Sequence, residues 1–228
     1  MAQRKCFAYS NNFNRAVIAN FRYIRFYFIK SFYYGVHMFA YKKKYFLIIE
    51  NIKDIDLSNI KLTNKFIIIY RNENKIENID KLLKFRRYCK AKKIDFYIAN
   101  DFRLMVFLNA DGLYISAKNT NLQLSRFKNS NYKIIGSAHN IKELNLKILQ
   151  GCTHFIFSRL FKTSYENKKG FMGVIKFNLF KLSRKESLVP LGGIRLSNLN
   201  RLSLVNSNSF VLSSEIKKKP AKIINRLF

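Results

Sequence analysis

The sequence predicts a (β/α)₈ barrel, the TIM-barrel architecture, preceded by a basic, aromatic N-terminal extension. From Tyr45 onward, short apolar runs alternate with longer helical patterns, which is typical of βα units repeated around a parallel sheet. The sequence contains eight such runs, the number of strands that this barrel requires. A chain of 228 residues is also long enough to bury one full core.

Eight strands are predicted in chain order, over residues 45–49, 66–70, 95–99, 112–115, 132–136, 154–157, 188–191 and 209–212. The best helical patterns cover 77–92 and 141–150. Asn140 is suited to cap the second of these helices, because Glu143 follows three residues later and Gly151 stops the pattern.

Three further helices are expected on weaker grounds. Segments 53–62 and 117–129 have incomplete helical patterns. A final helix is predicted from about Pro220 to Leu227, since proline suits the first turn of a helix.

Residues 1–42 form the basic extension, and residues 43–228 form the predicted barrel domain. No acidic residue precedes Glu50, and the basic residues Arg22, Arg25 and Lys30 interrupt any apolar run long enough to span a membrane. Three interpretations of the extension stay open: an organellar presequence, a helix on a membrane surface, or a translated upstream stretch with Met38 as the start.

The net charge and the cysteine content indicate which partners, metal sites and compartment suit this protein. The formal net charge is +30, from 43 basic and 13 acidic side chains, and favours anionic partners. The bias extends along the whole chain without a nucleic-acid motif, which disfavours nucleic acid as the partner. Three cysteines at wide spacings predict neither a disulfide framework nor a zinc site. Cys89 and Cys152 lie in or beside apolar helical segments and indicate small buried thiols in a reducing compartment, so we expect a cytoplasmic protein.

Small and polar residues follow the last two predicted strands. Gly192 and Gly193 follow the seventh strand, and Ser213 and Ser214 follow the eighth. In such barrels the loops after these two strands often bind phosphate, and glycine lets backbone amides approach an oxyanion closely. The alternative for the glycine pair is an ordinary tight turn.

Six short motifs in order resemble those of the thiamine phosphate synthase and TenI family, over about residues 45–228. They are Tyr70-Arg71, Asn100-Asp101, Ala110 to Tyr114, Ile135 to His139, Phe161 to Ser164, and Gly192 to Ile194. The family's synthases join hydroxymethylpyrimidine diphosphate to thiazole phosphate, which releases diphosphate and forms thiamine phosphate. Loss of diphosphate leaves a cationic pyrimidine methylene group, so the resemblance implies Mg²⁺, basic groups and a dry barrel mouth.

The resemblance implies roles for individual residues. Arg71 would hold diphosphate, Asn100 would orient it, Asp101 would bind Mg²⁺, and Ser137 would contact the diphosphate or the reacting ring. The thiazole phosphate side would comprise Thr163, Ser164, Lys168, Gly192, Gly193, Ser213 and Ser214. Phosphorylated small molecules would be the substrates, and a homo-oligomer is allowed.

This chain departs from the family pattern on the diphosphate side. The lysine expected two residues after Arg71 is replaced by Glu73, and the second acidic metal ligand by Asn119, a neutral oxygen donor. The glutamine expected before the arginine is Ile69, and the histidine of the fourth strand is Tyr114. The phosphate end of the pattern is kept.

Two alternative functions therefore stay open. A thiazole tautomerase of the TenI kind needs a proton shuttle and a phosphate site, and His139 would be its acid and base. A structural role for His139, at the start of helix 141–150, is an equal alternative. The third hypothesis is a non-catalytic barrel that binds a phosphorylated ligand or a protein, which Glu73 and Asn119 favour.

Overall fold

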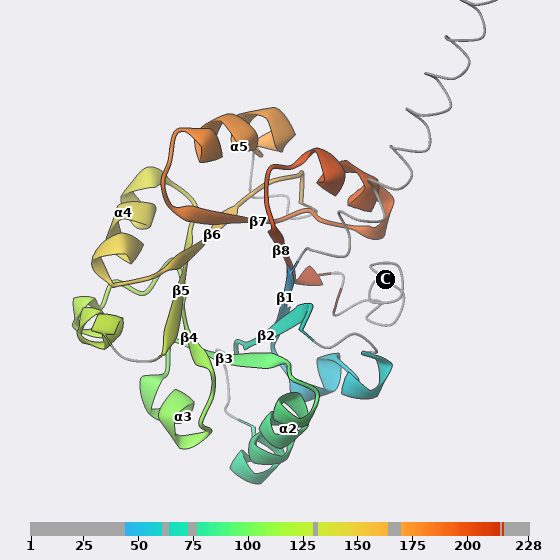
Figure 1. Cartoon of the computed structure of the whole chain (residues 1–228), viewed down its shortest axis with the longest axis vertical. Coiled ribbons are helices and arrows are strands. Elements are labelled where there is room, and N and C mark those ends of the chain that lie inside the picture. Colours follow the sequence, from blue (N-terminus) through green and yellow to red (C-terminus); the bar gives the residue numbers. More distant parts are fainter. Residues whose placement is uncertain are drawn as a thin grey trace, which may run out of the picture. The chain divides into compact units, whose positions relative to one another are not determined.

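Eight parallel strands close into a barrel in the computed structural model, which describes residues 44–60, 64–72, 77–129, 132–163, 170–214 and 216 (Figure 1). The strands are β1 (Lys44–Ile49), β2 (Phe66–Tyr70), β3 (Asp95–Ala99), β4 (Gly112–Ile115), β5 (Lys133–Ala138), β6 (His154–Ser158), β7 (Ser187–Leu191) and β8 (Ser209–Leu212). Neighbours in sequence pair with each other, and β8 pairs with β1. The predicted barrel is confirmed, and every predicted strand is present within two residues at either end.

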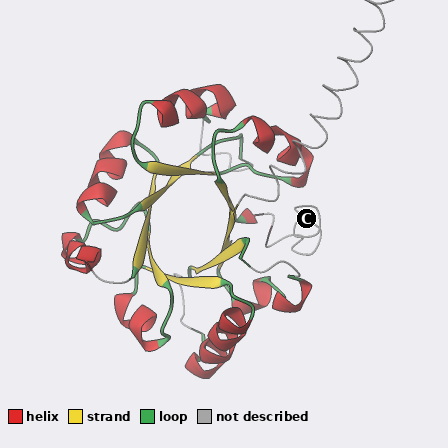
Figure 2. Cartoon of the chain, viewed as in Figure 1, coloured by secondary structure: helices red, strands yellow, loops and turns green. Residues whose placement is uncertain are grey.

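Helices surround the ring of strands (Figure 2). The α-helices of the described residues are α2 (Ile79–Ala91), α3 (Phe102–Phe107), α4 (Ile141–Leu149) and α5 (Gly173–Leu182). The predicted helices 77–92 and 141–150 correspond to α2 and α4. The predicted cap of α4 is also present, because the Asn140 side chain accepts a hydrogen bond of 2.9 Å from the Glu143 N–H.

The described parts of segments 53–62 and 117–129 do not form the α-helices predicted for them. The structure has short 3₁₀ stretches at Ile52–Asp54, Leu57–Asn59 and Leu122–Asn129. Side chains compete with the helical hydrogen bonds here: Asp56 accepts from the Ser58 N–H, and Asn119 accepts from the Asn121 N–H. Such local bonds offer the backbone an alternative to a helix.

The sequence analysis missed α3, α5 and the 3₁₀ helix Leu196–Leu204. The helix predicted from about Pro220 to Leu227 lies outside the described residues, as does the extension of residues 1–42. Within the described ranges, no helix is both long and apolar enough to cross a bilayer.

Two apolar layers stabilise the barrel. One fills its interior, with large side chains such as Tyr97 and Tyr114, and the other lies between strands and helices. The side chains of β1 divide between them by alternation: Phe46 and Ile48 belong to the interior layer, and Leu47 to the outer layer. A Cβ atom on Gly112 would lie 2.4 Å from the Tyr97 ring, so glycine there makes room for the tyrosine inside the barrel.

Candidate active site

The residues predicted for the site gather at one end of the barrel, because all the strands are parallel and therefore end on the same side. At or just beyond the carboxyl ends of the strands lie Arg71, Asn100, Asp101, Asn119, Ser137, His139, Thr163, Gly192, Gly193, Ser213 and Ser214. Ser164 and Lys168 lie outside the described residues, and so does Glu73.

A cavity of 890 Å³ opens at the ends of β2, β3 and β4, and we call it the β2–β4 cavity. Arg71, Asn100, Asp101 and Asn119 all line it, so four predicted residues from three strands share one space. Other charged lining residues are Arg103 and Lys118. Three cationic side chains and one carboxylate make this cavity suited to an anion that carries a metal ion.

Asn100 connects the two loops that border this cavity. Its side-chain oxygen accepts hydrogen bonds from the Ser116 N–H at 2.9 Å and from the Asn119 amide at 3.2 Å. The backbone of Asn100 has φ of 61°, a left-handed conformation that asparagine adopts more readily than most residues. The Asn119 oxygen in turn accepts from the Asn121 N–H at 3.0 Å. Both amide side chains therefore hold the loops in place.

Asp101 has a structural contact and one unengaged oxygen. Its Oδ1 accepts a hydrogen bond of 2.9 Å from the Leu104 N–H and caps α3. Its Oδ2 has no hydrogen-bond partner among the described residues and belongs to a half-buried side chain on the cavity wall.

The donors in the β2–β4 cavity fit a magnesium ion only in part. The described residues contain no group of three or more His, Cys, Asp or Glu side chains that could hold a metal ion. Mg²⁺ is commonly bound by one or two carboxylates together with substrate phosphates. Asp101 supplies one carboxylate, so a Mg²⁺ ion that arrives with a diphosphate fits better than a metal held by protein ligands alone.

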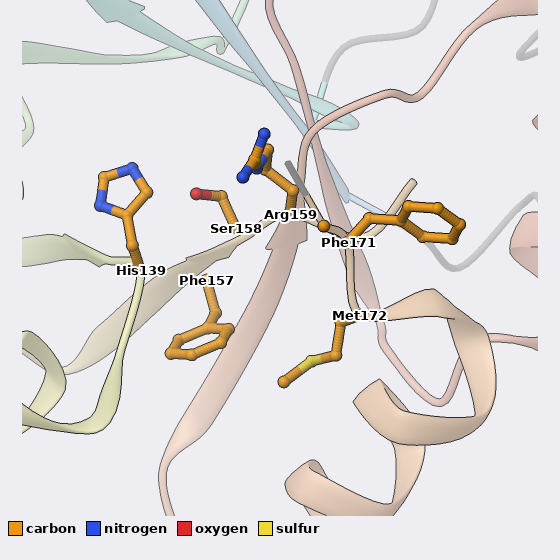
Figure 3. A pocket seen from close by; sticks show the side chains of 7 residues that line it. His139, Phe157, Ser158, Arg159, Phe171 and Met172 are labelled. Atoms are coloured by element: carbon orange, nitrogen blue, oxygen red, sulfur yellow. The ribbon is translucent and has the colours of Figure 1, made fainter. Parts of the chain in front are cut away.

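A second cavity, of 480 Å³, lies at the ends of β5 and β6 (Figure 3). We call it the β5–β6 cavity. Its polar lining comprises His139, Ser158 and Arg159, and its apolar lining includes Phe171 and Met172. In Figure 3 the Ser158 hydroxyl points towards the side of the cavity on which His139 lies.

His139 both lines this cavity and helps to start α4. Its Nδ1 lies 2.9 Å from Glu143 Oε2, and its backbone N–H donates to the same oxygen at 2.7 Å. Desolvation would raise the pKa of Glu143, but these hydrogen bonds outweigh it and lower that pKa. The structural role expected for His139 is therefore present, and Nε2 is the ring nitrogen that this contact does not use.

Ser137 faces the barrel interior. It is 7% exposed and pairs in register with Ile156, which belongs to the interior layer. Neither the β2–β4 cavity nor the β5–β6 cavity is lined by Ser137. The structure thus places it inside the barrel and in the lining of neither cavity.

The glycine pair lets two loops approach closely. Gly192 and Gly193 have φ of 102° and 68°, and a Cβ atom on Gly193 would lie 2.5 Å from the Phe161 carbonyl oxygen. The Phe161 N–H donates to the Gly192 carbonyl at 3.0 Å. In the adjoining loop, the hydroxyl of Thr163 is buried and has no hydrogen-bond partner among the described residues. A buried hydroxyl without a partner is uncommon in proteins and requires an explanation, and a bound ligand would provide one.

Ser213 and Ser214 are half-buried just beyond β8. β8 pairs with β7 at Leu191 and Val211, so the serines follow the strand beside the one that carries the glycine pair. The two residue pairs predicted to bind phosphate thus follow neighbouring strands.

Asp111 of the Ala-Asp-Gly motif has a structural role at the other end of the barrel. It precedes β4 and accepts hydrogen bonds from the Arg86 guanidinium at 2.9 Å and from the Phe96 N–H at 2.7 Å. These bonds connect α2, β3 and β4.

Sequence reasoning missed Arg103, Ser158 and Arg159 as lining residues. The end of the apolar run Phe155 to Phe157 was the available signal for Ser158 and Arg159, because polar residues at that point follow a strand. No pattern pointed to Arg103, which lies in the unpredicted helix α3.

Comparison with known proteins agrees with these observations. The family model described as thiamine monophosphate synthase matches residues 57–216. The thiamine-phosphate synthase of Pelagibacter ubique is 30% identical over 200 residues, which cover 82% of this chain and 96% of that protein. Its counterpart in Clostridium acetobutylicum is 26% identical over 148 residues, which cover 62% of this chain and 70% of that protein.

A solved structure shows the same fold. The thiamine phosphate pyrophosphorylase from Pyrococcus furiosus superposes with a TM-score of 0.61 at 13% identity, over 84% of this chain and 99% of that one. The ordered motifs, the closed barrel and the length of the match to the family model lead to one conclusion: the chain belongs to the thiamine monophosphate synthase family.

Proposed function

We propose that this chain is a transferase of thiamine biosynthesis that couples hydroxymethylpyrimidine diphosphate to thiazole phosphate. The observation that carries the proposal is the β2–β4 cavity, in which Arg71, Asn100 and Asp101 meet at the ends of two adjacent strands. These are the residues for which the family resemblance implies contacts to diphosphate and its metal ion. Membership of the family supports the same reaction.

The reaction breaks one bond and forms another. The bond between the pyrimidine methylene carbon and the diphosphate oxygen breaks, and its electron pair leaves with the diphosphate. The thiazole nitrogen then donates its lone pair to the methylene carbon. A site for this reaction must stabilise the leaving anion and keep water away from the cation.

In this proposal, the cationic residues of the β2–β4 cavity bind the diphosphate. Arg71 provides a planar group suited to two phosphate oxygens, and Lys118 supplies a second positive charge on the cavity wall, which would compensate for the missing family lysine. Asp101 would hold Mg²⁺ together with the diphosphate, and Asn119 would be at most a weaker, neutral ligand. When bound, Mg²⁺ would neutralise charge that develops on the leaving group.

The thiazole phosphate is assigned to the opposite side of the mouth. The backbone around Gly192 and Gly193 and the hydroxyls of Ser213 and Ser214 would contact its phosphate. The buried Thr163 hydroxyl, which has no hydrogen-bond partner among the described residues, supports a ligand at this side. Ser164 and Lys168 stay predictions for the same group. Ser137, which faces the barrel interior, would contact the diphosphate or the reacting ring.

The test is a coupling assay with the full chain, hydroxymethylpyrimidine diphosphate, thiazole phosphate and Mg²⁺. Thiamine phosphate and diphosphate should form in equal amounts, and chelation of Mg²⁺ should stop both. Absence of coupling by folded protein, at substrate concentrations that saturate the Pelagibacter relative, would refute the proposal.

A tautomerase is the second candidate, favoured by one observation. His139 lies at the β5–β6 cavity next to Glu143, a carboxylate that can orient an imidazole for proton transfer. Thiazole tautomer conversion should be followed in the same samples. Conversion without coupling, lost in His139→Gln, would move the assignment to this reaction.

Two statements on the protein's surroundings also stay predictions. A cytoplasmic location is consistent with the buried, reduced Cys89 and Cys152. Self-association is consistent with an exposed apolar stripe on α5, formed by Ile175, Leu179 and Leu182, and light scattering would measure it.

A further inference from the structure

Two polar side chains at the end of α4 are fully buried behind the β2–β4 cavity: Lys147, in the helix, and Gln150, its C-terminal cap residue. Lys147 and Gln150 are both 0% exposed, although lysine and glutamine are rarely buried in this way. Among the described residues, no carboxylate lies within salt-bridge distance of Lys147. Burial lowers the pKa of the Lys147 ammonium, because its charged form is poorly solvated there. An apolar residue would cost less at this position, so the lysine requires an explanation.

Both side chains converge on the loop that follows β4. Lys147 Nζ donates to the Asn119 carbonyl at 2.6 Å, and the Gln150 amide donates to the same carbonyl at 3.1 Å. Gln150 also donates to the Asn121 carbonyl at 3.0 Å and accepts from Lys147 at 2.8 Å. Four hydrogen bonds thus join these two side chains to each other and to this loop. Such a satisfied buried network holds its members in one arrangement.

The barrel sequence leaves space for the lysine. A Cβ atom on Gly136 would lie 2.9 Å from Lys147 Cβ and Cγ, and 2.7 Å from the Cys152 sulfur. Gly136 belongs to the Ile-Gly-Ser segment of β5. The absence of a side chain there lets the lysine stem lie against the outside of β5.

The network continues from the loop into the cavity. The Asn119 side chain donates to Asn100 Oδ1 at 3.2 Å, and Asn100 directly precedes Asp101. A continuous set of hydrogen bonds therefore leads from the buried face of α4, through the loop that carries Lys118 and Asn119, to the residue beside Asp101. Every loop in this series lines the β2–β4 cavity.

We propose that Lys147 and Gln150 are positioning residues for the diphosphate side of the site, and that they act by fixing the loop 116–121 through its backbone carbonyls. The identity of the substrate rests on the proposed function. The positioning role itself rests on the hydrogen bonds that Lys147 and Gln150 donate to the loop. Neither side chain touches the substrate, because both are enclosed behind the loop.

The first test compares Lys147→Met with Lys142→Met in the full chain. Lys142 is an exposed residue of the same helix, so its variant controls for the loss of a lysine. Calorimetry with inorganic pyrophosphate and Mg²⁺ should show binding weakened about fivefold to tenfold in Lys147→Met. Lys142→Met should bind like wild type. The KM for thiazole phosphate should stay within about twofold in both variants. Weaker pyrophosphate binding with an unchanged KM for thiazole phosphate is a combination that a general loss of folded protein would not give.

The second test uses Gln150→Glu, which keeps an acceptor for Lys147 and removes both donors to the loop. Hydrogen exchange of amides 117–121 should become faster in this variant and in Lys147→Met, while exchange in β5 stays unchanged. Unchanged exchange in the loop, or pyrophosphate affinity equal to that of Lys142→Met, would overturn the positioning role. A wild-type chain that binds magnesium pyrophosphate without coupling would instead refute the proposed reaction and leave the positioning role standing.

Discussion

At the scale of single residues, Asp101 combines a cap with a free carboxylate oxygen, and the two roles can be separated by substitution. Asparagine is as good a helix cap as aspartate but carries no charge. Asp101→Asn should therefore retain the bond to the Leu104 N–H, which now measures 2.9 Å, and leave the melting temperature nearly unchanged. The kcat/KM for coupling should fall by about 100-fold or more, the loss that even indirect partners of metal sites can cause.

Asp101→Ala is the matched variant, because it removes the cap as well as the charge. It should lose the same activity and about 1 kcal/mol of stability in addition. Full activity of Asp101→Asn at limiting Mg²⁺ would contradict the metal role of Asp101.

Gly193 has no room for a side chain. A Cβ atom there would lie 2.5 Å from the Phe161 carbonyl and 2.6 Å from the Lys162 carbonyl, and its φ of 68° is unfavourable for alanine. Gly193→Ala should therefore displace the loop that carries Thr163, lower stability by about 1 to 3 kcal/mol and raise the KM for thiazole phosphate.

Gly170 provides the control for this substitution. Its φ is 85°, but no atom of the described residues lies within 4 Å of the Cβ position. Gly170→Ala therefore carries only the cost of backbone conformation. Equal effects of the two variants on the KM for thiazole phosphate would show that close packing at Gly193 is unimportant for the site.

At the scale of elements, the predictable features are those that depend on local sequence. The predicted cap of α4, Asn140, is observed, and α2 is also capped by an asparagine, Asn78, which the sequence analysis did not name. By contrast, α5 exposes Ile175, Leu179 and Leu182. Its apolar residues are therefore not confined to one buried face, and the sequence lacks the alternation of apolar and polar residues by which a surface helix is recognised. α3 has six residues, too few for a period to be recognised.

The ion pair between α2 and the β3–β4 connection gives a prediction for one element. Arg86 donates to Asp111 at 2.9 Å and to the Asn109 carbonyl at 3.0 Å, and its side chain is largely buried. Arg86→Met should lower the free energy of unfolding by about 2 kcal/mol, because it removes the only cation that pairs with Asp111 among the described residues and leaves the Asn109 carbonyl without the Arg86 donor. Urea denaturation measures this change. Arg87→Met, at the exposed neighbouring position, should cost less than about 0.5 kcal/mol, and equal losses would contradict a specific anchor.

The candidate site was predictable only where it depends on topology. Asn100, Asp101 and Gly193 follow strands, and the ends of parallel strands meet at one mouth, so their proximity could be inferred from chain order. The contact of Asn100 with Asn119 and the burial of Lys147 could not. They depend on which loop conformation Asn119 adopts and on the space beside Gly136, neither of which is a local property of the sequence.

At the scale of the whole molecule, burial governs the ionisation of two thiols. It raises the pKa of Cys89 and of Cys152 to about 12, above the ordinary value of 9.0. Since the folded-state pKa is raised, the stability linked to these groups is present below pH 9 and is lost as pH rises from about 9 towards 12.

A Cys6→Ser chain isolates the two thiols for measurement. At pH 8 the protein should react with a thiol reagent only after it unfolds. The urea concentration at the denaturation midpoint should decrease as the pH is raised from 9 to 11. Rapid labelling of folded protein at pH 8 would contradict their burial.

Many of the few acidic side chains in this basic protein bind backbone N–H groups. Six of the 13 acidic residues accept a hydrogen bond from a backbone N–H in the described structure: Asp54, Asp56, Glu77, Asp101, Asp111 and Glu143. These carboxylates begin helical turns or join separate segments, so they hold the backbone, and Asp111 also forms an ion pair with Arg86. Substitution of any of these six carboxylates would therefore remove a backbone tether of the fold together with one of the 13 negative charges of the chain.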